Sequence, residues 1–229
     1  MDGAPTGVTT KAMLGLAQLV VVIALALFIP AGTVRFIDGW IFLAVFSASS
    51  FAITRYLMKN DPKLLERRTQ AGPVAEKEPR QKLIQSLAGI AFLSTLIVPA
   101  LDRRFRWSDV PTAAVIGGDA VVALGFLAIL FVFKANTFTS SIIEVAPGQR
   151  VIETGPYATV RHPMYSGALV MFIGVPLALG SYVGLLTFVP FAAVIVWRLL
   201  DEERFLANHL AGYAEYRRKT RYRLIPHVW

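Results

Sequence analysis

The run Ala12–Ile29, AMLGLAQLVVVIALALFI, contains 18 residues and no charged side chain. A helix of that length crosses most of the ~30 Å hydrocarbon core of a bilayer, because each helical residue adds about 1.5 Å. The run therefore predicts a transmembrane helix. Its recurrence along the chain decides the fold class.

Five more apolar runs of comparable length follow the first. They cover Trp40–Met58, Leu83–Leu101, Ala113–Phe133, Pro163–Leu179 and Val183–Leu200. Only Gly180-Ser181-Tyr182 separates the last two runs, which predicts an antiparallel hairpin joined by a tight turn. We predict an all-α, polytopic transmembrane bundle of five to six spans. It forms one membrane domain over residues 1–229, with residues 1–133 supplying the N-terminal spans.

The composition agrees with a membrane protein. Hydrophobic residues make up 55% of the 229 residues and charged residues 17%, whereas soluble domains average about 25% charged residues. The net charge of +8 does not indicate a nucleic-acid partner, because the basic residues cluster at the ends of the apolar runs. The chain has no cysteine, which excludes disulfides, thiolate nucleophiles and Cys-ligated metals. Membrane lipids are the expected surroundings.

The distribution of Lys and Arg predicts the orientation. If the N-terminus lies inside, 19 of the 23 basic residues fall in inside segments. The four outside are Arg35, Arg103, Arg104 and Arg106, and the last three form a cluster that opposes the trend. The overall bias places both termini in the cytoplasm. The same rule places the candidate site residues named below at the cytoplasmic face.

Two polar segments lie on that predicted inner side. The loop Lys59–Lys82 carries charges of both signs and reads as a surface loop, with a short interfacial helix over Pro62–Arg68. The stretch Tyr213–Lys219 is amphipathic and basic, which is typical of a helix at the lipid headgroups. The first three spans hold almost no ionisable groups. We therefore expect the site residues to follow Lys134.

The first candidate site is the stretch Gly155–Tyr165, GPYATVRHPMY. Pro163 suits the first helical position, which makes His162 the N-cap residue. The free N–H groups of that helix end can bind a carboxylate or another anion. Tyr157 and Tyr165 flank the helix end with aromatic faces that can hold an adenine or a cation. The alternative is that Arg161 and His162 are interfacial anchors.

The second candidate lies at the end of the last span. Arg198 and Glu202 stand four residues apart and so share one helix face. Three consecutive acids, Asp201, Glu202 and Glu203, oppose the helix dipole there. Either the helix continues into water with a solvated face, or the charges are used. No metal site is predicted, because the remaining histidines lack ligand spacing.

The ordered motifs resemble the isoprenylcysteine carboxyl methyltransferase family and its relatives, the phospholipid N-methyltransferases. The resemblance covers residues 134–229, which we interpret as a methyltransferase-like catalytic region. Its motifs are Gly155–Tyr157, Arg161–Gly167, Arg198–Glu203, Tyr213–Tyr216 and Pro226. The sequence departs from the family pattern at Leu210–Gly212, where the family has Phe-Gly, and at Gln149, where eukaryotic enzymes tend to have histidine.

The resemblance implies methyl transfer from S-adenosyl-L-methionine. The cofactor-binding residues that it implies are Gln149, Arg150, Val151, Ile152, Tyr157, His162, Pro163, Met164 and Tyr165. The implied catalytic, substrate-side residues are Arg198, Glu202 and Glu203.

The implied acceptor is a lipidic or isoprenoid-bearing small molecule, and carboxyl O-methylation of an isoprenylcysteine-like substrate is the first reading. Arg198 could hold its carboxylate in bidentate fashion, and Glu202 could fix Arg198 or hold a cationic head. The alternatives are a phospholipid amine N-methyltransferase, a sterol-type NADPH-dependent reductase and a non-catalytic scaffold. Oligomeric state is left open.

Overall fold

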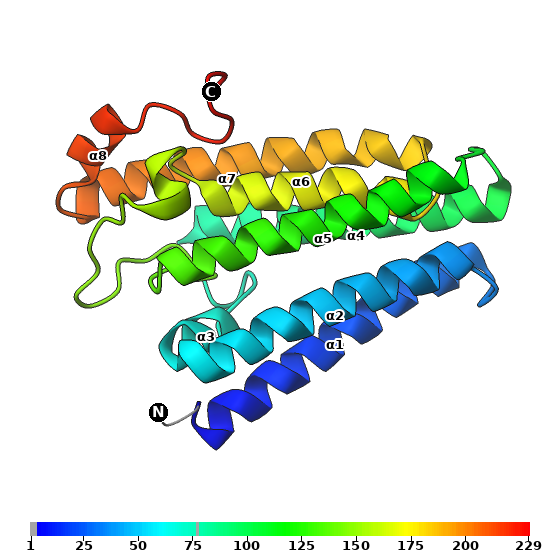
Figure 1. Ribbon diagram of the computed structural model, residues 1–229, viewed down its shortest axis with the longest axis horizontal. Helices are drawn as coiled ribbons and strands as arrows, with labels where there is room; N and C mark the ends of the chain where they lie inside the picture. The colour runs from blue at the N-terminus through cyan, green and yellow to red at the C-terminus, as the bar shows by residue number, and fades with distance from the viewer. Residues whose placement is uncertain (1–3, 77) are drawn as a thin grey trace.

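The computed structural model describes residues 4–76 and 78–229, and all regular secondary structure within them is helical (Figure 1). The helices are α1 (Thr6–Ala31), α2 (Ile37–Asn60), α3 (Pro62–Thr69), α4 (Pro79–Phe105), α5 (Thr112–Ala135), η1 (Gly155–Ala158), α6 (Pro163–Ala178), η2 (Val183–Thr187), α7 (Phe188–His209) and α8 (Tyr213–Lys219). The predicted all-α class is confirmed.

Among the described residues, five helices are long and apolar enough to cross a membrane. They are α1, α2, α4, α5 and the continuous η2–α7 unit, Val183–His209. Helix α6 has 16 residues, a length of about 24 Å, and falls short of the roughly 20 residues that a span requires. The fifth predicted span, Pro163–Leu179, is therefore an apolar helix shorter than a full crossing.

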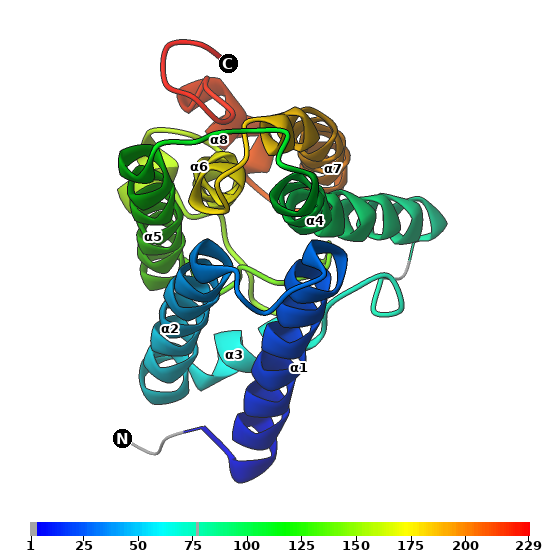
Figure 2. The same cartoon turned by 90° about the vertical axis from the view of Figure 1, so that its right-hand side faces the viewer.

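Helix α6 lies between α5 and α7 (Figure 2) and packs most closely on α5. At Gly125 of α5, an added Cβ would lie 2.5 Å from Met171 Cβ and 2.7 Å from Met171 Cα. Small residues let two helices approach this closely, and the contact energy then comes from backbone packing. The close approach fixes the start of α6 beside the end of α5.

Helix α3 is positioned by its own cap and by an apolar cluster. The Asp61 carboxylate accepts a hydrogen bond from the Leu64 N–H at 3.0 Å, and Pro62 occupies the first turn, where its missing N–H costs nothing. Leu64 and Leu65 are buried with Phe133 of α5. The predicted short helix is confirmed. It is held at the same end of the bundle as the start of α6.

The C-terminal segment returns to the start of α6. The N–H groups of Arg161 and His162 donate to the carbonyl oxygens of Tyr222 and Arg223 at 2.9 and 3.0 Å. The Ser166 hydroxyl donates to the Leu224 carbonyl at 2.7 Å. The last residues of the chain therefore brace the helix end that carries the first candidate site.

Candidate active site

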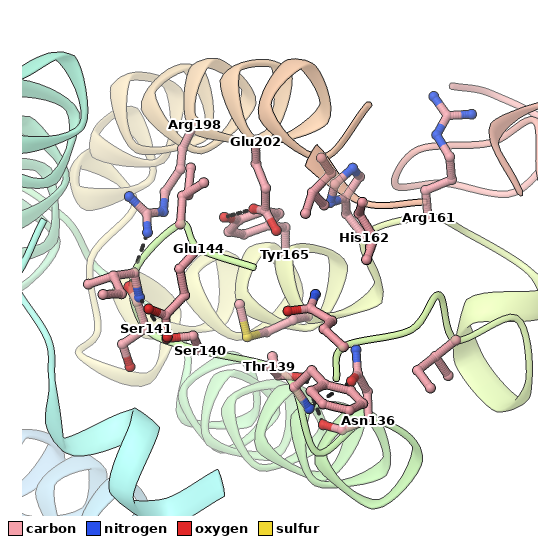
Figure 3. A pocket seen from close by; sticks show the side chains of 18 of the residues that line it. Asn136, Thr139, Ser140, Ser141, Glu144, Arg161, His162, Tyr165, Arg198 and Glu202 are labelled. Carbon is pink, nitrogen blue, oxygen red and sulfur yellow. Dashed lines mark hydrogen bonds between the residues drawn. The ribbon is translucent and has the colours of Figure 1, made fainter. Parts of the chain in front are cut away.

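A cavity of about 350 Å³ opens at the end of the bundle where α5 ends, α6 begins and α7 ends (Figure 3). All nine residues implied as cofactor-binding line it: Gln149, Arg150, Val151, Ile152, Tyr157, His162, Pro163, Met164 and Tyr165. Arg198 and Glu202 also line it. The fold thus gathers residues from four separate stretches of the sequence around one space.

The start of α6 forms one wall. Pro163 is the first helical residue and His162 the N-cap, without a side-chain capping bond, so the first N–H groups of the helix have no partner from that cap. The ring of His162 stacks on Tyr165 with centroids 5.8 Å apart. This wall combines a positive helix end with aromatic faces.

Tyrosines form a second wall. The Tyr157 hydroxyl accepts a hydrogen bond from the Asn136 side-chain amide at 3.0 Å, and its carbonyl accepts one from the Tyr216 hydroxyl at 2.8 Å. Burial raises the pKa values of Tyr157, Tyr213 and Tyr216, so these phenols are neutral at physiological pH. The buried Tyr213 hydroxyl has no hydrogen-bond partner among the described residues. It is available to a bound molecule.

The loop between α5 and η1 closes a third side, and Gln149 shapes it. Its side-chain carbonyl oxygen accepts a hydrogen bond from the Ala146 N–H at 2.8 Å. This bond closes the turn that precedes Val151 and Ile152. The side-chain oxygen of Gln149 therefore organises the loop.

Arg198 reaches the cavity from α7 and is fixed by three hydrogen bonds. It donates to Gln81 Oε1 at 2.9 Å, to Glu76 Oε1 at 2.9 Å and to the Ser141 carbonyl at 3.0 Å. Both Arg198 and Glu76 are buried. The ion partner of Arg198 is thus Glu76, and not Glu202 as one reading of the sequence allowed.

Glu202 bonds to a different group. Its carboxylate accepts a hydrogen bond from the Tyr165 hydroxyl at 2.5 Å. Figure 3 shows Arg198 and Glu202 extending toward the cavity from one helix, with Tyr165 against Glu202. The four-residue spacing therefore places both on one face, as the sequence indicated.

Glu203 lies outside the cavity wall that the described residues form. It is 3% exposed and pairs with Arg161 at 2.6 Å and Arg223 at 3.0 Å. Its carboxylate also lies 3.3 Å from His162 Nε2. One helical residue turns a side chain by about 100°, so Glu203 points away from the space that Glu202 faces. Its contacts join α7 to the C-terminal segment and the start of α6.

Several cavity residues come from α3, from the loop after it and from the first turns of α4. Arg68 of α3 and Gln85 of α4 line the cavity, and Glu76 and Gln81 hold Arg198. The expectation that all site residues follow Lys134 is therefore too narrow. The only signal in the sequence was that this loop is charged and contains a short helix.

Residues 113–212 match the family model described as phospholipid methyltransferase. A Schizosaccharomyces pombe protein named protein-S-isoprenylcysteine O-methyltransferase is 28% identical over 112 residues, which cover 43% of this chain and 46% of that protein.

A Mus musculus protein named Delta(14)-sterol reductase TM7SF2 is 31% identical over 105 residues, which cover 42% of this chain and 25% of that protein. The chain thus spans less than half the length of the curated relatives it matches. The resemblance to the phospholipid methyltransferase family is confirmed over residues 113–212, from the start of α5 to the turn before α8.

Proposed function

We propose that the protein is a membrane methyltransferase that uses S-adenosyl-L-methionine to methylate a lipidic or isoprenoid-bearing acceptor. The observation that carries the proposal is the cavity in which all nine family-implied cofactor residues meet Arg198 and Glu202. The orientation predicted by the basic residues would place this cavity at the cytoplasmic face.

The cavity fits the methyl donor. Its volume of about 350 Å³ lies within the roughly 300–1,000 Å³ typical of small-molecule sites. Tyr157 and Tyr165 offer aromatic faces to an adenine or a sulfonium. The partnerless Tyr213 hydroxyl offers a donor, since buried polar groups usually have partners in the functional state.

The bound donor supplies a sulfonium methyl group for in-line displacement. The protein then has to position the two reactants and exclude water from between them. Positioning accounts for most of the rate gain in such reactions. The start of α6 would hold a negative group of the ligand through its N–H groups. The Tyr165 ring, fixed by Glu202 on one side and stacked on His162 on the other, would orient the reacting end.

A carboxylate acceptor is the first proposed substrate type, with an isoprenylcysteine-like molecule as the leading case. An ionised carboxylate is already nucleophilic and requires no general base. Arg198 retains N–H donors beyond the three used in the fold, because a guanidinium has five. Glu76 and Gln81 hold that guanidinium in place, so it could orient an acceptor carboxylate without a loss of side-chain entropy on binding.

An amine acceptor is the second candidate, and one feature of Glu202 favours it. No described Lys or Arg lies within ion-pair distance of this carboxylate, although it faces the cavity. A carboxylate of this kind can hold an ammonium group and accept its proton before transfer. The neutral amine would then take the methyl group while the thioether S-adenosylhomocysteine leaves.

Radiolabelled methyl transfer in membranes tests the proposal. Membranes from cells expressing the protein, and from cells carrying the empty vector, are incubated with S-adenosyl-L-[methyl-³H]methionine, and lipids are extracted. We expect label above the vector control. Mild base releases a methyl ester as volatile methanol and leaves N-methyl groups in place, which separates the two acceptor classes. No label above the control with total lipid and isoprenoid acceptors contradicts the proposal.

A further inference from the structure

Among the described residues, four arginines line the cavity: Arg68, Arg150, Arg161 and Arg198. Arg150 is exposed to solvent, and the other three differ in which carboxylate neutralises them. Arg161 is paired with Glu203 and Arg198 with Glu76, at 2.6 and 2.9 Å. Arg68 has no carboxylate within ion-pair distance among the described residues. It therefore contributes an uncompensated positive charge to the cavity wall.

The hydrogen-bonding capacity of Arg68 is also largely unused. Its Nη1 atom lies 3.5 Å from the Ser140 carbonyl oxygen and 3.6 Å from the Met164 sulfur, both of which are weak contacts. Its guanidinium lies over the Phe133 ring, 4.8 Å from the centroid. By contrast, Arg198 makes three bonds of 3.0 Å or less. The Phe133 ring thus orients the Arg68 guanidinium, and most of the five N–H donors at the edge of this planar group have no strong hydrogen-bond partner.

Arg68 keeps its charge in this position. Burial lowers the pKa of Arg68 to about 10, which leaves the guanidinium protonated at neutral pH. A half-buried cation without a carboxylate partner costs free energy. A ligand carboxylate would remove that cost, and Arg matches a carboxylate in bidentate geometry.

The backbone around Arg68 is rigid enough for such a role. Its carbonyl oxygen accepts a hydrogen bond from the Ser141 hydroxyl at 3.3 Å. Leu64 and Leu65, on the same short helix, are buried in an apolar cluster. Met164, which Arg68 contacts, belongs to the wall proposed for the methyl donor. The guanidinium is thus fixed next to the proposed donor site by a part of the chain outside residues 113–212.

We infer that Arg68 binds a ligand carboxylate inside the cavity. The inference rests on the proposed function and adds a ligand contact from the N-terminal half. Two ligands could carry that group: the methyl donor, in its methionine part, or the acceptor. Both present the same chemistry to the guanidinium, and the experiment separates them.

Binding of two adenosine thioethers to purified protein tests the inference. S-adenosylhomocysteine carries the carboxylate, and 5′-methylthioadenosine has the same nucleoside and sulfur without it. We expect Arg68→Gln to weaken the binding of S-adenosylhomocysteine by about 10- to 100-fold, as loss of a charged hydrogen bond does. The binding of 5′-methylthioadenosine should be unchanged. Arg68→Lys, which keeps the charge and loses the planar fork, should lie between.

The matched control is Arg67→Gln. Arg67 is the neighbour of Arg68 on α3, and its Nη1 donates to the Thr137 carbonyl at 2.7 Å. It does not line the cavity formed by the described residues, so both ligands should bind the control as they bind the wild type. If Arg68→Gln leaves S-adenosylhomocysteine unchanged but raises the KM of a carboxylate acceptor at least about 10-fold, the acceptor supplies the carboxylate.

Two outcomes overturn the inference. Equal weakening of both thioethers in Arg68→Gln would show that Arg68 shapes the cavity without binding the carboxylate. Unchanged thioether binding together with an unchanged acceptor KM would show that it binds no ligand carboxylate. Failure of the proposed function is separate, because it appears in the wild type as absence of S-adenosylhomocysteine binding.

Discussion

The two halves of the molecule are built differently. In α1, 17% of the apolar window is buried within the protein, against 39% in α5. The side chains of Leu14, Val21 and Ile29 of α1 are exposed, as suits a lipid-facing helix, whereas α5 and α6 meet through glycine contacts. The C-terminal half thus has the denser packing, but it does not form the site alone.

The N-terminal half contributes through one short polar region. Arg68, Glu76 and Gln81 reach the cavity or its Arg198 from the residues between α2 and the start of α4. The spans before and after this region act as its support. Loosely packed helices can therefore still determine the electrostatics of a site through the loop that they carry.

The largest expected effect lies on the C-terminal side, at Glu202. Glu202→Gln should lower kcat by at least about 100-fold, in the range of lost acid–base or positioning groups, because the carboxylate faces the cavity and fixes Tyr165. Binding of S-adenosylhomocysteine should persist in calorimetry. The exposed Glu215→Gln on α8 is the control and should retain activity.

Loss of S-adenosylhomocysteine binding in Glu202→Gln would move this residue to the donor site. Retention of wild-type turnover would remove Glu202 from the proposed mechanism.

The next effect tests the contribution of the N-terminal half. Glu76→Gln leaves Arg198 without its counter-ion, and we expect about a 10-fold loss in kcat/KM together with a stability loss of about 1–3 kcal/mol. Glu78→Gln is the matched control, because Glu78 is exposed two residues along. Activity assays and thermal unfolding in detergent measure both.

If Glu76→Gln behaves like Glu78→Gln, Arg198 is not positioned by the N-terminal half. The two halves would then differ in packing density, and Glu76 would make no contribution to the site.

The smallest effect concerns packing within the C-terminal half. Gly125→Ala places a Cβ 2.5 Å from Met171 Cβ and should cost about 1–3 kcal/mol through overpacking. Gly117→Ala on the same helix meets no described atom within 4 Å and should be neutral or slightly stabilising. Thermal unfolding of the two variants compares them, and equal midpoints would contradict the close α5–α6 contact.

Much of the architecture could be predicted from the sequence because it depends on local patterns. Long apolar runs predict spans, and Pro163 after His162 predicts the start of α6. The short motifs could be assigned to one site because their order and the antiparallel hairpin bring them to the same end of the bundle. The apolar run Pro163–Leu179 predicts the bounds of α6 to within one residue, but its composition alone does not decide whether the helix crosses the bilayer fully.

The partners of the site residues could not be predicted in the same way. Arg198 and Glu76 are 122 positions apart, and nothing in a polar loop indicates which carboxylate turns inward. Glu202 and Glu203 are adjacent and identical in type. Their roles differ because α7 turns Glu202 toward the cavity and Glu203 toward the returning C-terminal segment. Such assignments depend on tertiary packing, which hydropathy and motif spacing do not encode.

Calorimetric titration of the wild-type protein, with S-adenosylhomocysteine in one arm and NADPH in the other, tests the central claim most directly. The two ligands distinguish a methyltransferase from an NADPH-dependent reductase. The similarity to the mouse sterol reductase makes the reductase the alternative to test. We predict saturable binding of S-adenosylhomocysteine at one site per chain and no binding of NADPH. Binding of NADPH without S-adenosylhomocysteine would contradict the account.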